Sequence, residues 1–150
     1  MLAAEMTYRG RGFNHVLGAR RRQNGPVLAK LRQALAAIDG VEESDSAFKA
    51  DVGYWVNGKE IAHLEGQAAI DVRLTRPVIR DRRVELRADP RVRLRTNASD
   101  WLTVELAGAD AIAFVVELVE AAAAAHRAAP GTTAAPPPRG ADLARRRRFH

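Results

Sequence analysis

Two residues that could carry out acid–base chemistry, His63 and Asp71, lie in neighbouring predicted strands of the sequence. If the turn at 66–68 has three residues, an antiparallel hairpin places His63 opposite Asp71. The carboxylate could then orient one imidazole nitrogen and leave the other free as a base. We favour a simpler interpretation, a cross-strand polar pair, because no nucleophile is placed beside these residues. His63 and Asp71 are therefore candidates only, and no catalytic residue is assigned.

Metal and cofactor chemistry find little support in the sequence. Glu65 could join His63 and Asp71 as a third metal ligand, but two carboxylates and one histidine on one hairpin often occur by chance. The chain has no cysteine, which excludes disulfides, thiolate ligands and cysteine nucleophiles. Glycine-rich phosphate loops of the usual spacing are also absent. We predict no metal and no cofactor.

The face of the predicted sheet that carries His63 also carries cationic and aromatic residues. Arg91, Arg93 and Arg95 alternate along one strand, so their side chains should point the same way. Tyr54 and Trp101 would offer stacking surfaces beside them, as in single-strand nucleic-acid binding, although charged residues on edge strands also serve to block strand pairing. The predicted binding face consists of Tyr54, His63, Asp71, Arg73, Arg91, Arg93, Arg95 and Trp101.

The elements that must position this face define a small α+β fold. Asn57-Gly58 predicts a two-residue hairpin turn, because both residues tolerate positive φ. Pro26 opens a helix that ends near Gly40, Thr75 caps a second helix that runs to about Arg87, and a third helix spans 110–126. Strands are predicted at 41–45, 51–56, 59–65, 69–74, 91–95 and 101–106. We expect an antiparallel sheet of about five or six strands with helices packed on one face.

Strand alternation also predicts which side chains lie under the helices. A regular turn at Asn57-Gly58 pairs Tyr54 with Ile61 and puts both on the open face, with Trp55 on the core face. The predicted core face consists of Trp55, Ala62, Leu64, Ile70, Val72, Leu74, Val92, Leu94, Leu102, Val104 and Leu106.

The net charge of +6 is carried by the two ends of the chain. Residues 1–22 have a net charge of +4 and residues 127–150 of +5, whereas residues 23–126 hold 13 Lys and Arg against 16 Asp and Glu, a net −3. We predict a basic N-terminal arm (1–22), a folded domain (23–127) and a disordered Pro/Arg-rich tail (128–150) that makes no contacts with the domain. The C-terminal run of four arginines could bind nucleic acid weakly, because flexible cations attract polyanions without sequence preference. These residues are Arg145, Arg146, Arg147 and Arg148. Without cysteine, a leader or a long apolar run, the chain is expected in the cytoplasm and away from membranes.

Several motifs resemble a known family. These are Val56-Asn57-Gly58-Lys59-Glu60-Ile61-Ala62-His63, then Ile70-Asp71-Val72-Arg73, Asp89-Pro90-Arg91 and Ser99-Asp100-Trp101. In order and spacing they resemble the luciferase-domain family, small α+β proteins of unknown function that are distinct from the flavin-dependent luciferases. The resemblance covers about 40–125. The order of strands and helices is also distantly similar to the double-wing MmcQ/YjbR-like proteins.

Three functions remain open from the sequence. The first is a non-enzymatic module that binds an unknown ligand or protein partner, or a second copy of itself, on the open sheet face. The second is a nucleic-acid-associated protein that uses the arginine triplet and the basic ends. The third is a small enzyme centred on His63 and Asp71. An enzyme predicts a concave pocket around His63 with a shifted imidazole pKa, whereas nucleic-acid binding predicts a flat positive surface.

Overall fold

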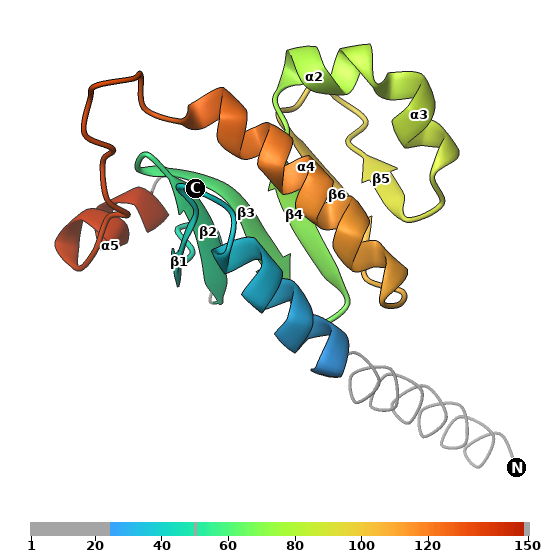
Figure 1. Ribbon diagram of the computed structural model, residues 1–150, viewed down its shortest axis with the longest axis horizontal. Coiled ribbons are helices and arrows are strands. Elements are labelled where there is room, and N and C mark those ends of the chain that lie inside the picture. Colours follow the sequence, from blue (N-terminus) through green and yellow to red (C-terminus); the bar gives the residue numbers. More distant parts are fainter. Residues whose placement is uncertain (1–24, 50, 149–150) are drawn as a thin grey trace, which may run out of the picture.

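The computed structural model describes residues 25–49 and 51–148, and the predicted N-terminal arm lies outside these residues. The strands form one six-stranded antiparallel sheet in the order β1-β2-β3-β4-β6-β5 (Figure 1). Their bounds are β1 Glu42–Asp45, β2 Val52–Val56, β3 Lys59–Glu65, β4 Ala69–Arg73, β5 Val92–Leu94 and β6 Trp101–Glu105.

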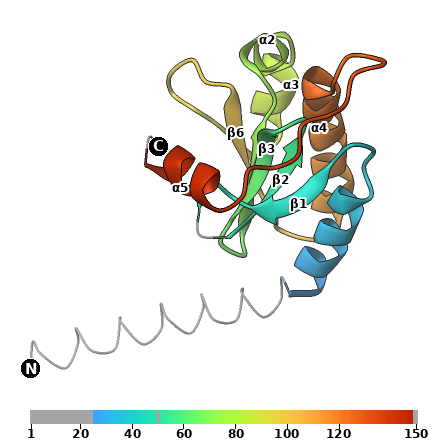
Figure 2. The ribbon, with the colours of Figure 1, turned by 90° about the vertical axis from the view of Figure 1, so that its left-hand side faces the viewer.

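Two long helices cover one face of this sheet. Residues 25–36 are helical, and α4 spans Asp110–His126. The remaining helices are α2 Arg76–Asp81, α3 Arg83–Ala88 and α5 Ala141–Arg147. Figure 2 shows α4 and the helix at 25–36 on one side of the sheet and α5 on the other. The predicted α+β class and antiparallel sheet are confirmed. None of the helices in the described residues is long and apolar enough to cross a membrane.

The hydrophobic core lies between the sheet and the long helices. Leu31 and Leu35 recur at helical spacing and are fully buried, as are Val115, Leu118 and Ala122 of α4. The sheet contributes the predicted aliphatic residues Leu64, Ile70, Val72, Leu102 and Val104. Burial of this apolar face is what holds the sheet against the helices.

A β-bulge changes the predicted faces of β2. Asn57 and Gly58 form the expected turn, with φ of 50° and 72°, and Val56 pairs with Lys59. Beyond that pair the register shifts: Trp55 lies opposite Glu60, and Tyr54 lies opposite Ala62. The extra residue, Ile61, joins Ala62 in the core. The bulge therefore reverses which residues of β2 face the core and which face the open side of the sheet. The predicted faces of Tyr54, Trp55 and Ile61 were therefore wrong.

The connection from β4 to β5 also differs from the prediction. A single helix ending near Arg87 is replaced by α2 and α3, which break at Arg82. Thr75 precedes α2 with φ 77° and makes no side-chain cap. The Asp100 carboxylate instead accepts a hydrogen bond from the Arg76 backbone N–H at 2.9 Å. The start of α2 is thus capped by Asp100, 24 residues away in the sequence, and not by the predicted local cap Thr75.

The segment predicted to be an unpaired tail contacts the sheet in the part of it that the structure describes, residues 128–148. The Ala135 backbone N–H donates to Asn57 Oδ1 at 2.8 Å. Leu143 of α5 packs with Ala47 and Trp55, and Arg147 donates to the Ser46 carbonyl. The prediction missed these contacts because it placed Trp55 under the helices; on the opposite face, Trp55 provides the apolar surface that Leu143 covers.

A candidate ligand pocket on the open sheet face

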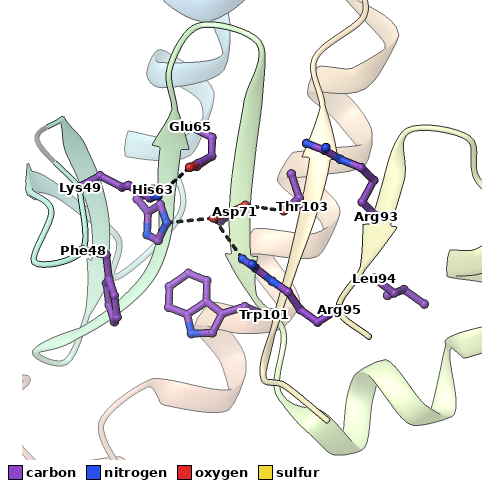
Figure 3. Close-up of a pocket in the computed structure, with 10 residues that line it drawn as sticks. All are labelled: Phe48, Lys49, His63, Glu65, Asp71, Arg93, Leu94, Arg95, Trp101 and Thr103. Atoms are coloured by element: carbon purple, nitrogen blue, oxygen red, sulfur yellow. Dashed lines mark hydrogen bonds and ion pairs between the residues drawn. The ribbon is translucent and has the colours of Figure 1, made fainter. Parts of the chain in front are cut away.

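The open face of the sheet holds a pocket of about 560 Å³, here called the aromatic pocket. Figure 3 shows its lining side chains coming from the loop after β1 and from strands β3, β4, β5 and β6. They are Phe48, Lys49, His63, Glu65, Asp71, Arg93, Leu94, Arg95, Trp101 and Thr103. Its volume falls within the range of small-molecule sites.

His63 is held between two carboxylates at the base of this pocket. Its Nε2 lies 3.1 Å from Asp71 Oδ2, confirming the predicted cross-strand neighbours, and its Nδ1 lies 2.9 Å from Glu60 Oε2. His63 is only 4% exposed. Asp71 also accepts hydrogen bonds from Thr103 Oγ1 at 2.6 Å and from Arg95 Nη2 at 3.3 Å. The network therefore joins three strands and the residue after β5.

Glu60 reaches His63 because of the bulge. Residues three apart on a regular strand point to opposite faces, but the extra residue at Ile61 returns both Glu60 and His63 to the same face. The Glu60 carboxylate also accepts hydrogen bonds from Ser46 Oγ at 2.9 Å and from the Ala47 backbone N–H at 2.7 Å. Gly53 leaves room for it, since a Cβ there would lie 3.0 Å from Glu60 Oε1.

The network favours a protonated His63. Burial alone lowers the pKa of His63, but hydrogen bonds with Asp71 and Glu60 outweigh burial and raise it above the usual 6.5. For Asp71, burial raises the pKa, and the hydrogen bonds from His63 and Thr103 outweigh it, so the pKa is lowered from 3.8. Only the imidazolium can donate to both carboxylates at once.

This geometry does not suit the proton-abstracting role considered for His63. A general base needs a free nitrogen lone pair directed at the substrate. Both nitrogens of His63 instead face carboxylate oxygens. The carboxylates of Glu60 and Asp71 contact different nitrogens of the His63 ring. Among the described residues, no cluster of three or more potential ligands could hold a metal ion. His63 links β3 to Asp71 of β4, and Glu60 continues the network to Ser46 and Ala47 in the loop after β1.

Aromatic side chains form one wall of the pocket. The ring centroids of Phe48 and His63 are 5.5 Å apart in a stacked arrangement, and Trp101 lies 4.9 Å from His63 and 5.3 Å from Phe48. Ser46 Oγ accepts hydrogen bonds from the Phe48 and Lys49 backbone N–H groups, both at 3.0 Å, which fixes the loop that carries Phe48. The Glu60 contacts with Ser46 thus connect the buried network to the aromatic wall.

The cations at the pocket already have carboxylate partners. Lys49 Nζ lies 2.7 Å from Glu65 Oε1, Arg93 lies 3.5 Å from Glu105, and Arg95 pairs with Asp71. A positive charge that is already paired attracts an added anion less strongly. The aromatic pocket therefore offers a polar rim rather than a strong positive field.

The structure brings together five of the eight predicted binding-face residues: His63, Asp71, Arg93, Arg95 and Trp101. Arg73 lies at the end of β4, 3.7 Å from Asp100.

Two predicted members of the binding face lie elsewhere. Tyr54 is fully buried in the core, and its hydroxyl donates to Glu43 at 2.8 Å. Arg91 precedes β5, pairs with Asp89 and stacks over Phe114 of α4 at 4.5 Å. The predicted arginine triplet is thus reduced to Arg93 and Arg95.

Sequence reasoning missed Glu60, Phe48 and Lys49 as site residues. Regular strand alternation places Glu60 and His63 on opposite faces, and the loop of Phe48 and Lys49 has no alternation to interpret. One available signal was Gly53 in the middle of a strand, since an isolated glycine there often marks a bulge or a close approach of another group.

The fold and this pocket define a small antiparallel α+β module with an open, ligand-sized site. The family model described as the luciferase domain matches residues 58–122, which include β3, β4, β5, β6 and most of α4. This match confirms the resemblance found in the motifs of the chain. No curated protein matches the chain.

Proposed function

We propose that this protein is a non-enzymatic binding module that holds a planar small molecule in the aromatic pocket. The observation that carries the proposal is the aromatic wall of Phe48, His63 and Trp101 beside a polar rim, in a hollow of about 560 Å³. An aromatic face gains contact area and stacking energy from a planar ring. Thr103 and Arg95 line the same pocket and offer polar groups for the edge of that ring. A cytoplasmic location remains part of this proposal.

Nucleic acid is a competing occupant of the same face. Bases could stack on Trp101, but the expected platform lacks Tyr54 and Arg91. Of the remaining arginines, Arg95 is paired with buried Asp71, and Arg93 makes an exposed contact with Glu105. The volume of the aromatic pocket, about 560 Å³, also suits a small ligand.

Isothermal titration with 1-naphthol, a planar ring with one hydroxyl, tests the proposal. We expect binding to a single site, weakened about tenfold in Trp101→Ala because stacking on an aromatic side chain contributes roughly 1–3 kcal/mol. Trp55→Phe is the matched control, since Trp55 lies outside the pocket lining beneath α5. Equal affinity in wild type and Trp101→Ala would contradict the proposal.

A parallel titration with a single-stranded dT12 oligonucleotide tests the alternative. Binding that Trp101→Ala and Arg93→Gln both weaken would favour nucleic acid as the ligand. Binding that neither variant changes would assign it to cations outside the pocket.

A further inference from the structure

A second pocket, of about 360 Å³, lies between α2 and the chain segment that joins β5 to β6. Four arginines line it, Arg76, Arg80, Arg83 and Arg95, and no carboxylate does. Asn97 and Ser99 add an amide and a hydroxyl to the lining. We call this site the arginine pocket.

Arg95 of the arginine pocket pairs with Asp71, but the charges of its other three arginines are compensated less than those of other arginines in this region. Arg82 pairs with both Glu85 and Glu117, and Arg91 with both Asp89 and Asp110.

By contrast, no carboxylate of the described residues pairs with the side chain of Arg76 or Arg83. Arg80 reaches only its neighbour Asp81, at 3.6 Å, with both side chains more than two-thirds exposed. Such an exposed pair is weak and screened by solvent. The pocket therefore concentrates positive charge within a domain whose residues 23–126 sum to −3.

Guanidinium groups match one ligand chemistry well. Their planar, forked N–H groups donate pairs of hydrogen bonds to phosphate oxygens, and several of them around one hollow favour a group with more than one negative charge. The arginine pocket also adjoins the aromatic pocket, because Leu94, Arg95 and Trp101 line both. A ring on Trp101 could therefore carry a substituent into the arginine pocket.

We propose that the arginine pocket binds the phosphate group of a planar ligand whose ring occupies the aromatic pocket. The protein would then recognise aryl or heteroaryl phosphate esters, with Arg76 and Arg83 as the principal phosphate contacts. This inference rests on the proposed function for the ring, whereas the phosphate contacts depend on different residues. The two can therefore fail separately.

Titration with 1-naphthyl phosphate and 1-naphthol, which differ only in the phosphate, tests the proposal. In phosphate-free buffer at low salt, we expect the phosphate ester to bind at least about tenfold more tightly. The Arg76→Gln/Arg83→Gln double variant should lose that advantage and keep the affinity for 1-naphthol. The control, Lys59→Gln/Arg87→Gln, removes the same charge from exposed positions outside both linings and should retain the advantage.

The outcomes separate the two proposals. Equal affinity for both compounds would overturn the phosphate site and leave the ring site intact. An equal loss in both double variants would overturn it too, because the advantage would then reflect net charge alone. If neither naphthyl compound binds, the ring site fails, and inorganic pyrophosphate decides the phosphate site. Pyrophosphate binding to the wild type that is lost in Arg76→Gln/Arg83→Gln would support the phosphate site. No pyrophosphate binding to the wild type would overturn it.

Discussion

On the helix-covered face of the sheet the buried side chains are aliphatic apart from Tyr54, whereas on the opposite face Glu60, His63 and Asp71 are buried with their polar groups. Apolar contacts are tolerant of direction, so the helix-covered face needs only residues of suitable size at the right parity. The polar face depends on hydrogen bonds whose loss leaves buried groups unsatisfied. One sheet is thus stabilised on its two sides by interactions with different requirements.

The difference also explains where a ligand can bind. Two long helices cover the aliphatic face, while on the polar face the helix α5 packs at one end, near Trp55 (Figure 2). At the other end the network of His63 and Asp71 forms the base of the open aromatic pocket. Buried hydrogen bonds hold these side chains in place with none of the described helices packed over the pocket, which leaves the pocket accessible.

The largest effect should come from the aliphatic face. We expect Leu64→Ala to cost about 2–5 kcal/mol of unfolding free energy, since Leu64 lies in the core at 4% exposure and its loss creates a cavity. Val84→Ala is the control, because Val84 is 87% exposed and should change stability by less than about 0.5 kcal/mol. Urea denaturation measures both, and similar costs would show that Leu64 is not core.

A smaller, pH-dependent effect should come from the polar face. His63→Gln should cost roughly 1–3 kcal/mol near pH 5–6, because two buried carboxylates lose the imidazolium that donates to both of them. The pKa of His63 is raised on folding, so its contribution is fully present below the unfolded value of 6.5 and is lost as the pH rises through the folded pKa. The pKa of Asp71 is lowered, so its contribution is present above 3.8 and is lost as the pH falls through the folded pKa.

Urea denaturation of wild type and His63→Gln across this range measures the effect. The stability difference should be greatest between about pH 4 and 6.5 and should shrink at higher pH. NMR titration of the His63 ring provides the matched test: Glu60→Gln should bring its pKa down, because one carboxylate loses its charge. A ring that titrates at the same pH in both proteins would show that Glu60 does not hold the proton on His63.

The two faces also differ in how much the sequence predicted. Aliphatic alternation identified Leu64, Ile70 and Leu102 as core, and the turn lengths predicted that His63 lies beside Asp71. The bulge at Ile61 could not be inferred from alternation, because Val-Asn-Gly-Lys is compatible with a regular hairpin. Its position depends on the tertiary contacts of Glu60 with Ser46 and Ala47. The aromatic pocket depends on these contacts of Glu60, so its shape could not be predicted from strand alternation.

The smallest effect on global stability should come from the α5 contact at the covered end of the polar face. Leu143 packs only with Ala47 and Trp55 in its cluster, and Arg146 donates to the Gly58 carbonyl at 3.2 Å. Leu143→Ala should therefore release α5 by local opening, with a cost of at most about 1 kcal/mol to the unfolding of the domain. Limited trypsin digestion with mass spectrometry should show faster cleavage after Arg146 and Arg147.

Cleavage after Arg87 in α3 provides the internal control, since that exposed site is independent of α5 and should be cut at the same rate in both proteins. If α5 covers Trp55, as its 1% exposure indicates, Leu143→Ala should also shift tryptophan emission to longer wavelength, because water then reaches the indole. Unchanged emission together with unchanged cleavage would mean that Leu143 does not hold α5 in place. A large loss of global stability would instead make α5 part of the core, and the polar face would then depend on an apolar cover as the opposite face does.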